Sequence, residues 1–550
     1  MRKDWLLLLI IILFPGANNP GPDSLVGLMV EFIREPEKLK ILDLKPEFTW
    51  IVPQEAKTQT SCQILVASAK ENLEKNTGDI WNSQRIMSSK SSEVEYGGSN
   101  LSGNTTYYWK VRIWNSKQKP TKYSEIQSFT TGNPDGYSTT GNKFQSQLIK
   151  PEKVVKLTGY SYFIDFGKDA FGTLVLETVP TEWILHTVPM FYYDFMYTGN
   201  IESVKKYYEE LKHKTLIALS REDGLISSKK CTDEIMTNLG FSSAKERLRD
   251  IVDWPPSQKD TEWKLATPEG KRDGYEMVEI NTVVNAFYYQ ELKCMSELAG
   301  RLGKNEDSVF YQKQALKVKK TFNEKLLNKS TGIYRDGESS QHSSLHANMM
   351  ALAFNLVPEE NKKAVIDFIK SHGMACSVYG AQYLLEGLYN AGEADYAFSL
   401  LTATDNRSWW NMIKTGSTIT MEAWGMKYKP NSDWNHAWGA APANIIPRYV
   451  WGIAPVEPGY AKAIFKPQLS SLKYSKITVP IIRGNIETEF IVTGKTKEYS
   501  ITIPANMECD FVLPIVRGFS VFLNSKKVDT RIKNIRMKPG LNKIIIKSAS

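Results

Sequence analysis

The chain lacks paired cysteines. Its 550 residues contain five cysteines, none in a Cys-x-x-Cys pair and none close to another along the sequence. This spacing predicts neither a disulfide framework nor a zinc site. We therefore expect isolated and mostly buried thiols at Cys62, Cys231, Cys294, Cys376 and Cys509.

Charge of a single sign and long hydrophobic runs are also missing. Lysine and arginine outnumber aspartate and glutamate by 69 to 60, a net charge of +9, and the lysines are scattered. Because no basic stripe forms, we expect a solvated surface and no nucleic-acid partner. Beyond residue 14 no segment resembles the run of about 20 apolar residues that spans a bilayer.

One short apolar run stands at the N-terminus. Arg2 and Lys3 precede apolar residues 5–14, and the small residues 15–17 follow. This order of charge, apolar core and small residues is typical of a secretory signal peptide. We place the signal at residues 1–18 and expect export to the periplasm or the exterior of a bacterium, with no other membrane association.

The length and composition are those of a multidomain globular protein. A chain of 550 residues exceeds one ordinary core, and 42% hydrophobic with 23% charged residues is an ordinary balance. The 14 tryptophans and 26 tyrosines suit carbohydrate contact. Large aromatic cores explain that count equally well.

The pattern divides the chain into β-rich ends and a helical middle. Residues 26–131 predict a fibronectin III-like β-sandwich with a supporting role, since strands such as 107–114 alternate with period two. Residues 143–177 carry one or two strands, too few for a domain. Apolar spacing of three and four in residues 178–457 predicts a toroid of helical hairpins, and residues 458–550 predict a second β-sandwich.

The segments 416–424 and 433–439 combine acidic, imidazole and indole side chains. Aromatic faces take the C–H side of a pyranose, polar groups take its hydroxyls, and a carboxylate can activate water. Glu422 is the candidate base, although it also suits the start of a helix. His436 is either a sugar contact or a core histidine, and Asp433 is more simply a turn cap.

Three tryptophans and one aspartate are candidate sugar contacts. Trp254, Trp410 and Trp424 either stack on a sugar or pack in the core. Asp253 either binds a sugar hydroxyl or caps the loop before Pro255.

Several motifs carry a family resemblance. They are Thr106–Trp114, Pro180-Thr181-Glu182-Trp183, Leu248–Pro255 and the block Glu422–Trp438. With them the chain resembles bacterial α-L-rhamnosidases of glycoside hydrolase family 78. The resemblance implies an (α/α)6 barrel flanked by β-sandwiches, which removes terminal α-L-rhamnose from oligosaccharides, polysaccharides or glycosides with inversion. It implies no metal and no cofactor.

The resemblance also implies roles for particular residues. Glu422 takes the place of the general base, His436 lines the sugar subsite, and Trp254 after Asp253 packs against rhamnose. The family's Asp-Gly-x-Arg-Glu-Arg-like motif, which holds the general acid, is not found before Pro180. Part of a central β-domain and the first barrel helices are missing there, so the toroid is expected to be incomplete.

Other acidic residues do not replace that motif. Glu182 is most simply a helix N-terminal carboxylate beside Thr181. The run Lys245-Glu246-Arg247 stands in the wrong place, just before Leu248. Because an acid or base contributes about 10²–10⁴-fold, we expect weak or absent activity on ordinary rhamnosides.

Four hypotheses stay open. The first is a shortened, impaired rhamnosidase, and the second is a rhamnose-binding pseudoenzyme without catalysis. The third is a decayed gene product whose exposed apolar barrel surface hinders folding. A polysaccharide lyase is the fourth, but it needs a Tyr or His base with charge neutralisation nearby, and no such cluster stands out in the sequence.

Overall fold

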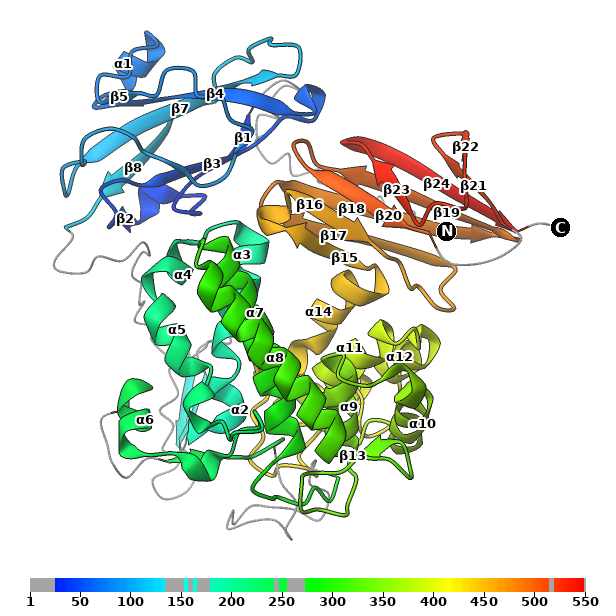
Figure 1. The fold of residues 1–550 in the computed structure, drawn as a ribbon. Helices are drawn as coiled ribbons and strands as arrows, with labels where there is room; N and C mark the ends of the chain where they lie inside the picture. The colour runs from blue at the N-terminus through cyan, green and yellow to red at the C-terminus, as the bar shows by residue number, and fades with distance from the viewer. Residues whose placement is uncertain are drawn as a thin grey trace, which may run out of the picture.

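The structure, a computed structural model, describes residues 25–133, 153–156, 162–165, 179–241, 247–254, 273–513 and 519–548. The signal peptide expected at residues 1–18 lies outside this part. Of residues 143–177 the structure describes one hairpin, in which β9 (Lys153–Lys156) pairs antiparallel with β10 (Tyr162–Asp165). Figure 1 shows a β-domain at each end of the chain, both above a helical domain.

The N-terminal domain is a sandwich of a three-stranded and a five-stranded sheet. The period-two prediction for residues 107–114 is confirmed, because Tyr107, Trp109, Val111 and Ile113 all enter the core between the sheets. A short helix, α1 (Lys70–Glu74), precedes β5. The first sheet runs β1 (Val26–Val30), β3 (Glu47–Ile51), β6 (Val94–Glu95), and the second runs β2 (Lys40–Ile41), β8 (Gln127–Thr131), β7 (Thr106–Asn115), β4 (Gln59–Ala67), β5 (Trp81–Asn82).

The middle domain is helical, as predicted. The long helices α7 (Thr282–Arg301) and α8 (Asn305–Lys325) form one hairpin, and α9 (Leu345–Ala353) packs against α7, α10 and α11. The remaining helices are α2 (Thr181–Ile184), α3 (Thr187–Thr198), α4 (Glu202–Lys206), α5 (Tyr208–Lys214), α6 (Asp233–Asn238), α10 (Lys362–His372), α11 (Gly380–Asn390), α12 (Ala394–Leu401), α13 (Trp409–Thr415) and α14 (Ala441–Ile445). Two small sheets join β11 (Val179–Pro180) to β12 (Leu248–Arg249) and β13 (Leu327–Asn328) to β14 (Ile333–Tyr334).

The C-terminal domain is the second β-sandwich. Its sheets run β15 (Ile453–Glu457), β16 (Lys462–Phe465), β20 (Glu508–Val512), β23 (Asn534–Met537) and β17 (Tyr474–Ile481), β18 (Gly484–Thr493), β19 (Thr496–Ile503), β24 (Gly540–Ser548), β21 (Phe519–Leu523), β22 (Lys526–Val528). The two β-domains touch: Gln54 donates to the carbonyl of Ile503 at 3.0 Å, and Asn506 donates to that of Ser89 at 2.7 Å.

The helical domain contains a wide, mostly apolar cavity of about 740 Å³. Phe287 and Tyr383 line it, with the ion pair of Arg448 and Glu386 at 3.2 Å. Met190 also lines it and is 68% exposed, which fits the expectation that a shortened barrel leaves apolar surface uncovered. Among the residues that the structure describes, no helix combines the length and apolar character needed to cross a bilayer.

The start of α7 depends on one buried cap. The side-chain oxygen of Asn281 accepts from the backbone N–H groups of Val283 at 2.9 Å and Val284 at 3.2 Å, and from the hydroxyl of Tyr275 at 2.7 Å. We expect Asn281→Ala to lower the free energy of unfolding by about 2–3 kcal/mol, since these donors lose their acceptor inside the protein. Denaturant unfolding measures this change. Thr232→Ala, which removes the exposed cap of α6, should cost less than about 1 kcal/mol.

Candidate active site

The two halves of the candidate motif lie side by side. The backbone N–H of Glu422 donates to the carbonyl of Asp433 at 2.9 Å, and that of His436 donates to the carbonyl of Thr420 at 2.8 Å. The Thr420 hydroxyl completes the pairing by donating to the carbonyl of His436 at 2.9 Å. Segments 420–422 and 433–436 therefore form one local unit, which brings Glu422 and His436 close together.

Glu422 is a nearly buried carboxylate with a cation beside it. It is 8% exposed, and its Oε2 lies 2.8 Å from the ammonium of Lys429 and accepts from the backbone N–H of Asp433 at 3.2 Å. Its Oε1 has no hydrogen-bond partner among the described residues. Such a carboxylate keeps one oxygen to accept a proton from water. No motif in the sequence pointed to Lys429.

A half-buried aromatic ring packs beside His436. Its ring lies 4.6 Å from that of Trp438, which contacts Trp183 at 5.4 Å and Tyr379 at 5.9 Å between ring centroids. The Tyr379 hydroxyl lies 2.9 Å from Nε2 of His186. These rings come from α2, α11 and the Glu422 motif, and they form a wall of the kind that receives the apolar face of a sugar.

Asp253 is fully engaged by the protein. Its Oδ2 lies 2.7 Å from Nε2 of His346 and accepts from the backbone N–H of Ser377 at 2.8 Å. Its Oδ1 accepts from the backbone N–H of Trp254 at 2.8 Å and from the hydroxyl of Ser377. With 2% exposure, Asp253 caps and orients its turn. The structure thus favours the loop-capping alternative over direct contact with a sugar hydroxyl.

Glu182 does not act only as a carboxylate at the start of a helix; it also binds the backbone of a distant turn. Its carboxylate accepts from the backbone N–H groups of Ile251 at 3.0 Å and Val252 at 2.6 Å. Val252 has a φ of 64°, a left-handed conformation that is unfavourable for a β-branched residue. The buried carboxylate stabilises this turn, and the turn presents Asp253 and Trp254. The pairing of β11 with β12 brings Glu182 next to this turn.

The three candidate tryptophans lie in different environments. For Trp424 the structure favours the core-packing alternative: it has no exposed surface, donates its indole N–H to the carbonyl of Cys376 at 2.7 Å and packs on Trp409. Trp254 is half-buried. Trp410 is 49% exposed on α13. For these two, contact with sugar stays a prediction.

The loop at Cys376 and Ser377 joins the two parts of the site. Trp424 binds the carbonyl of Cys376, and Asp253 binds the next residue, Ser377. The Glu422 motif and the Asp253 turn are therefore fixed to one short loop. Glu182 and Asp253 are both committed to hydrogen bonds within the chain.

The buried position of Glu182 gives folding a pH dependence. Burial, with the nearby Asp250, raises the pKa of Glu182 from 4.5 to about 8. The folded chain then binds this proton more tightly, so stability is lost as the pH rises from about 4.5 to about 8. We expect Glu182→Gln, which keeps an acceptor without charge, to flatten this loss in denaturant unfolding at several pH values.

Removal of the acceptor itself should lower the stability of the folded chain. In Glu182→Ala the buried N–H groups of Ile251 and Val252 lose their partner, at a cost of about 2–4 kcal/mol. Equal stability of the Gln and Ala variants would contradict the role of Glu182 as the acceptor for this turn.

The chain is similar to bacterial α-L-rhamnosidases. Residues 176–450 match the bacterial α-L-rhamnosidase six-hairpin glycosidase domain. Residues 26–135 match a Rha78A-like N-terminal immunoglobulin domain, and residues 452–521 match the bacterial α-L-rhamnosidase C-terminal domain. These matches agree with the three parts of the fold.

Individual relatives agree with this result. An α-L-rhamnosidase of Alteromonas sp. is 25% identical over 281 residues, which are 48% of this chain and 30% of the relative. One of Formosa agariphila is 42% identical over 89 residues, which are 16% of this chain and 9% of that relative. The matches therefore span a third or less of the length of these curated relatives.

Solved structures show the same fold. The α-L-rhamnosidase of Dictyoglumus thermophilum has a TM-score of 0.64 at 14% identity, and 96% of this chain and 99% of that chain are covered. The Streptomyces avermitilis enzyme complexed with L-rhamnose has a TM-score of 0.61 at 10% identity, with 95% and 100% covered. Since the six-hairpin match extends over half of the residues, the chain belongs to the bacterial α-L-rhamnosidase family of six-hairpin glycosidases.

Proposed function

We propose that this chain is an inverting glycoside hydrolase for terminal α-L-rhamnose, impaired because its sequence before Pro180 lacks the general-acid motif of the family. The observation that carries the proposal is the environment of Glu422. One of its oxygens is held by Lys429 and by the backbone of Asp433, while the other has no partner in the described part of the chain. A carboxylate that is held through one oxygen and has the other free suits removal of a proton from water.

Inversion requires a second carboxyl group. The two groups flank the bond about 6.5–9.5 Å apart, and the acid protonates the leaving oxygen. Glu182 serves the turn before Asp253, and Asp253 serves His346 and Ser377. Neither of these two carboxyl groups is free to act as the acid. Activity is therefore best sought on a substrate whose leaving group needs no protonation.

The sugar would occupy the space beside His436 and Trp438. The half-buried ring of Trp438 offers a face to the C–H groups of a pyranose, and the imidazole of His436 offers a ring nitrogen to a hydroxyl. The rhamnose complex of the Streptomyces relative supports rhamnose as the sugar. The aglycone of the substrate is left open by this arrangement.

A non-catalytic rhamnose-binding protein is the second candidate. The engagement of both Glu182 and Asp253 within the chain favours it, since a binding site needs the aromatic wall and no acid. Calorimetry with L-rhamnose beside a hydrolysis assay separates the two functions. Binding of rhamnose without turnover of an aryl α-L-rhamnoside would support the pseudoenzyme.

The base role predicts the effect of one substitution. We expect Glu422→Gln to lower kcat for an activated aryl α-L-rhamnoside by about 10²–10⁴-fold, because the amide cannot take a proton from water. L-Rhamnose affinity in calorimetry should change little. Glu306→Gln, on the exposed start of α8, is the matched control and should leave both quantities unchanged.

Two outcomes would contradict the proposal. Undiminished aryl-rhamnoside turnover in Glu422→Gln would exclude this residue as the base. Normal turnover of a natural rhamnoside by the unmodified chain would refute the absence of a working acid.

A further inference from the structure

Lys429 is a buried lysine in the loop between the two halves of the Glu422 motif. It is 7% exposed, and its ammonium lies 2.8 Å from Oε2 of Glu422. Lysine is almost never fully buried unless a partner compensates its charge, because the ammonium loses its hydration. The contact with Glu422 supplies that compensation.

The loop that carries Lys429 does not depend on the ammonium for its closure. The backbone N–H of Tyr428 donates to the carbonyl of Gly425 at 3.0 Å, and the Tyr428 side chain is buried. A second turn forms where the N–H of Ser432 donates to the carbonyl of Lys429 at 3.0 Å. The ammonium adds one bond, to the carbonyl of Asn431 at 3.1 Å. Since backbone bonds already form both turns, we expect the loop to keep its course when the ammonium is removed.

The Glu422 carboxylate depends on the ammonium more strongly. Its Oε2 has two contacts among the described residues, the Lys429 ammonium at 2.8 Å and the backbone N–H of Asp433 at 3.2 Å. A bond from a charged donor is the stronger kind, and 3.2 Å is the long end of the ordinary range for N–H···O. The ammonium is therefore the main restraint on Oε2, and it leaves Oε1 as the oxygen that can meet water.

Small displacements of a catalytic group have large effects on the rate. A misplacement of about 1 Å can cost about 10²-fold, so a base needs neighbours that fix its side chain. The proposed sugar contacts come from His436 and Trp438, whereas Lys429 contacts the base. Loss of the ammonium should therefore lower kcat and leave sugar binding largely intact.

We propose that Lys429 is a positioning residue for Glu422: its ammonium holds Oε2 and thereby aims Oε1 at the attacking water. This inference rests on the proposed function, in which Glu422 is the base. Lys429 acts through the carboxylate and does not itself take the proton, because an ammonium has donors and no acceptor.

The test uses the full chain and an activated aryl α-L-rhamnoside. Lys429→Met removes the ammonium and keeps a long, unbranched side chain. We expect kcat to fall about 10–100-fold, while KM and the calorimetric affinity for L-rhamnose stay nearly unchanged. Denaturant unfolding of each variant checks that it is folded.

Two further variants identify the cause of the loss. Lys429→Arg keeps a charged donor at the end of the side chain and should recover part of the lost kcat. Lys427→Met changes an exposed lysine two residues earlier in the same loop. It removes the same charge and should alter neither kcat nor KM.

The outcomes separate this inference from the function on which it rests. Undiminished kcat in Lys429→Met, in a chain whose turnover depends on Glu422, would refute the positioning role alone. A raised KM with loss of L-rhamnose affinity would show that Lys429 shapes the sugar site, and equal losses of kcat in the Met and Arg variants would show that the charge is not the cause. Either result overturns the proposal. Absence of turnover by the unmodified chain, or full turnover in Glu422→Gln, would remove the base itself and this inference with it.

Discussion

The carboxylate of Asp253 holds together elements that are far apart in the sequence. Its four contacts reach His346 on α9, the backbone and hydroxyl of Ser377, and the N–H of Trp254. A side chain at Gly380 would place its Cβ 2.9 Å from Oδ2 of Asp253, so the start of α11 approaches as only glycine can. Burial of this polar group is tolerated because both of its oxygens have hydrogen-bond partners. The rest of the site is arranged around this cluster.

This arrangement supports both the turn before Asp253 and the Glu422 motif. Glu182 holds the strained Val252 turn, and Trp424 fixes the Glu422 motif to the carbonyl of Cys376. Glu182 is thereby committed to hydrogen bonds within the chain.

Hydrogen bonds connect the two β-domains to each other and the N-terminal domain to the helical domain. Hydrogen bonds tie the two sandwiches to each other through Gln54 and Asn506, and Glu93 reaches Asn200 on the helical domain. At the contact with Asn200 the hydrogen bonding is incomplete, since the buried Oε1 of Glu93 has no partner among the described residues.

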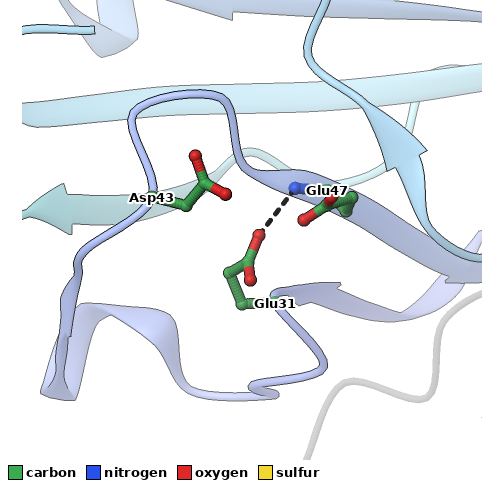
Figure 2. A group of neighbouring side chains, drawn as sticks. All are labelled: Glu31, Asp43 and Glu47. Atoms are coloured by element: carbon green, nitrogen blue, oxygen red, sulfur yellow. Dashed lines mark hydrogen bonds between the residues drawn. The ribbon is translucent and has the colours of Figure 1, made fainter. Parts of the chain in front are cut away.

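Local patterns in the sequence determined the strands of residues 107–114, the helical middle and the short separation of Glu422 from His436, because period, propensity and chain proximity act over a few residues. They also determined which residue types suit a sugar. Tertiary structure alone decided what each does: Trp424 is buried, Asp253 is bonded on both oxygens, and Glu182 meets a turn 69 residues away. The same holds for Glu31, Asp43 and Glu47, whose side chains turn toward one another only in the folded N-terminal domain (Figure 2). Burial and long-range hydrogen bonding depend on which surfaces meet, and a sequence read segment by segment does not specify that.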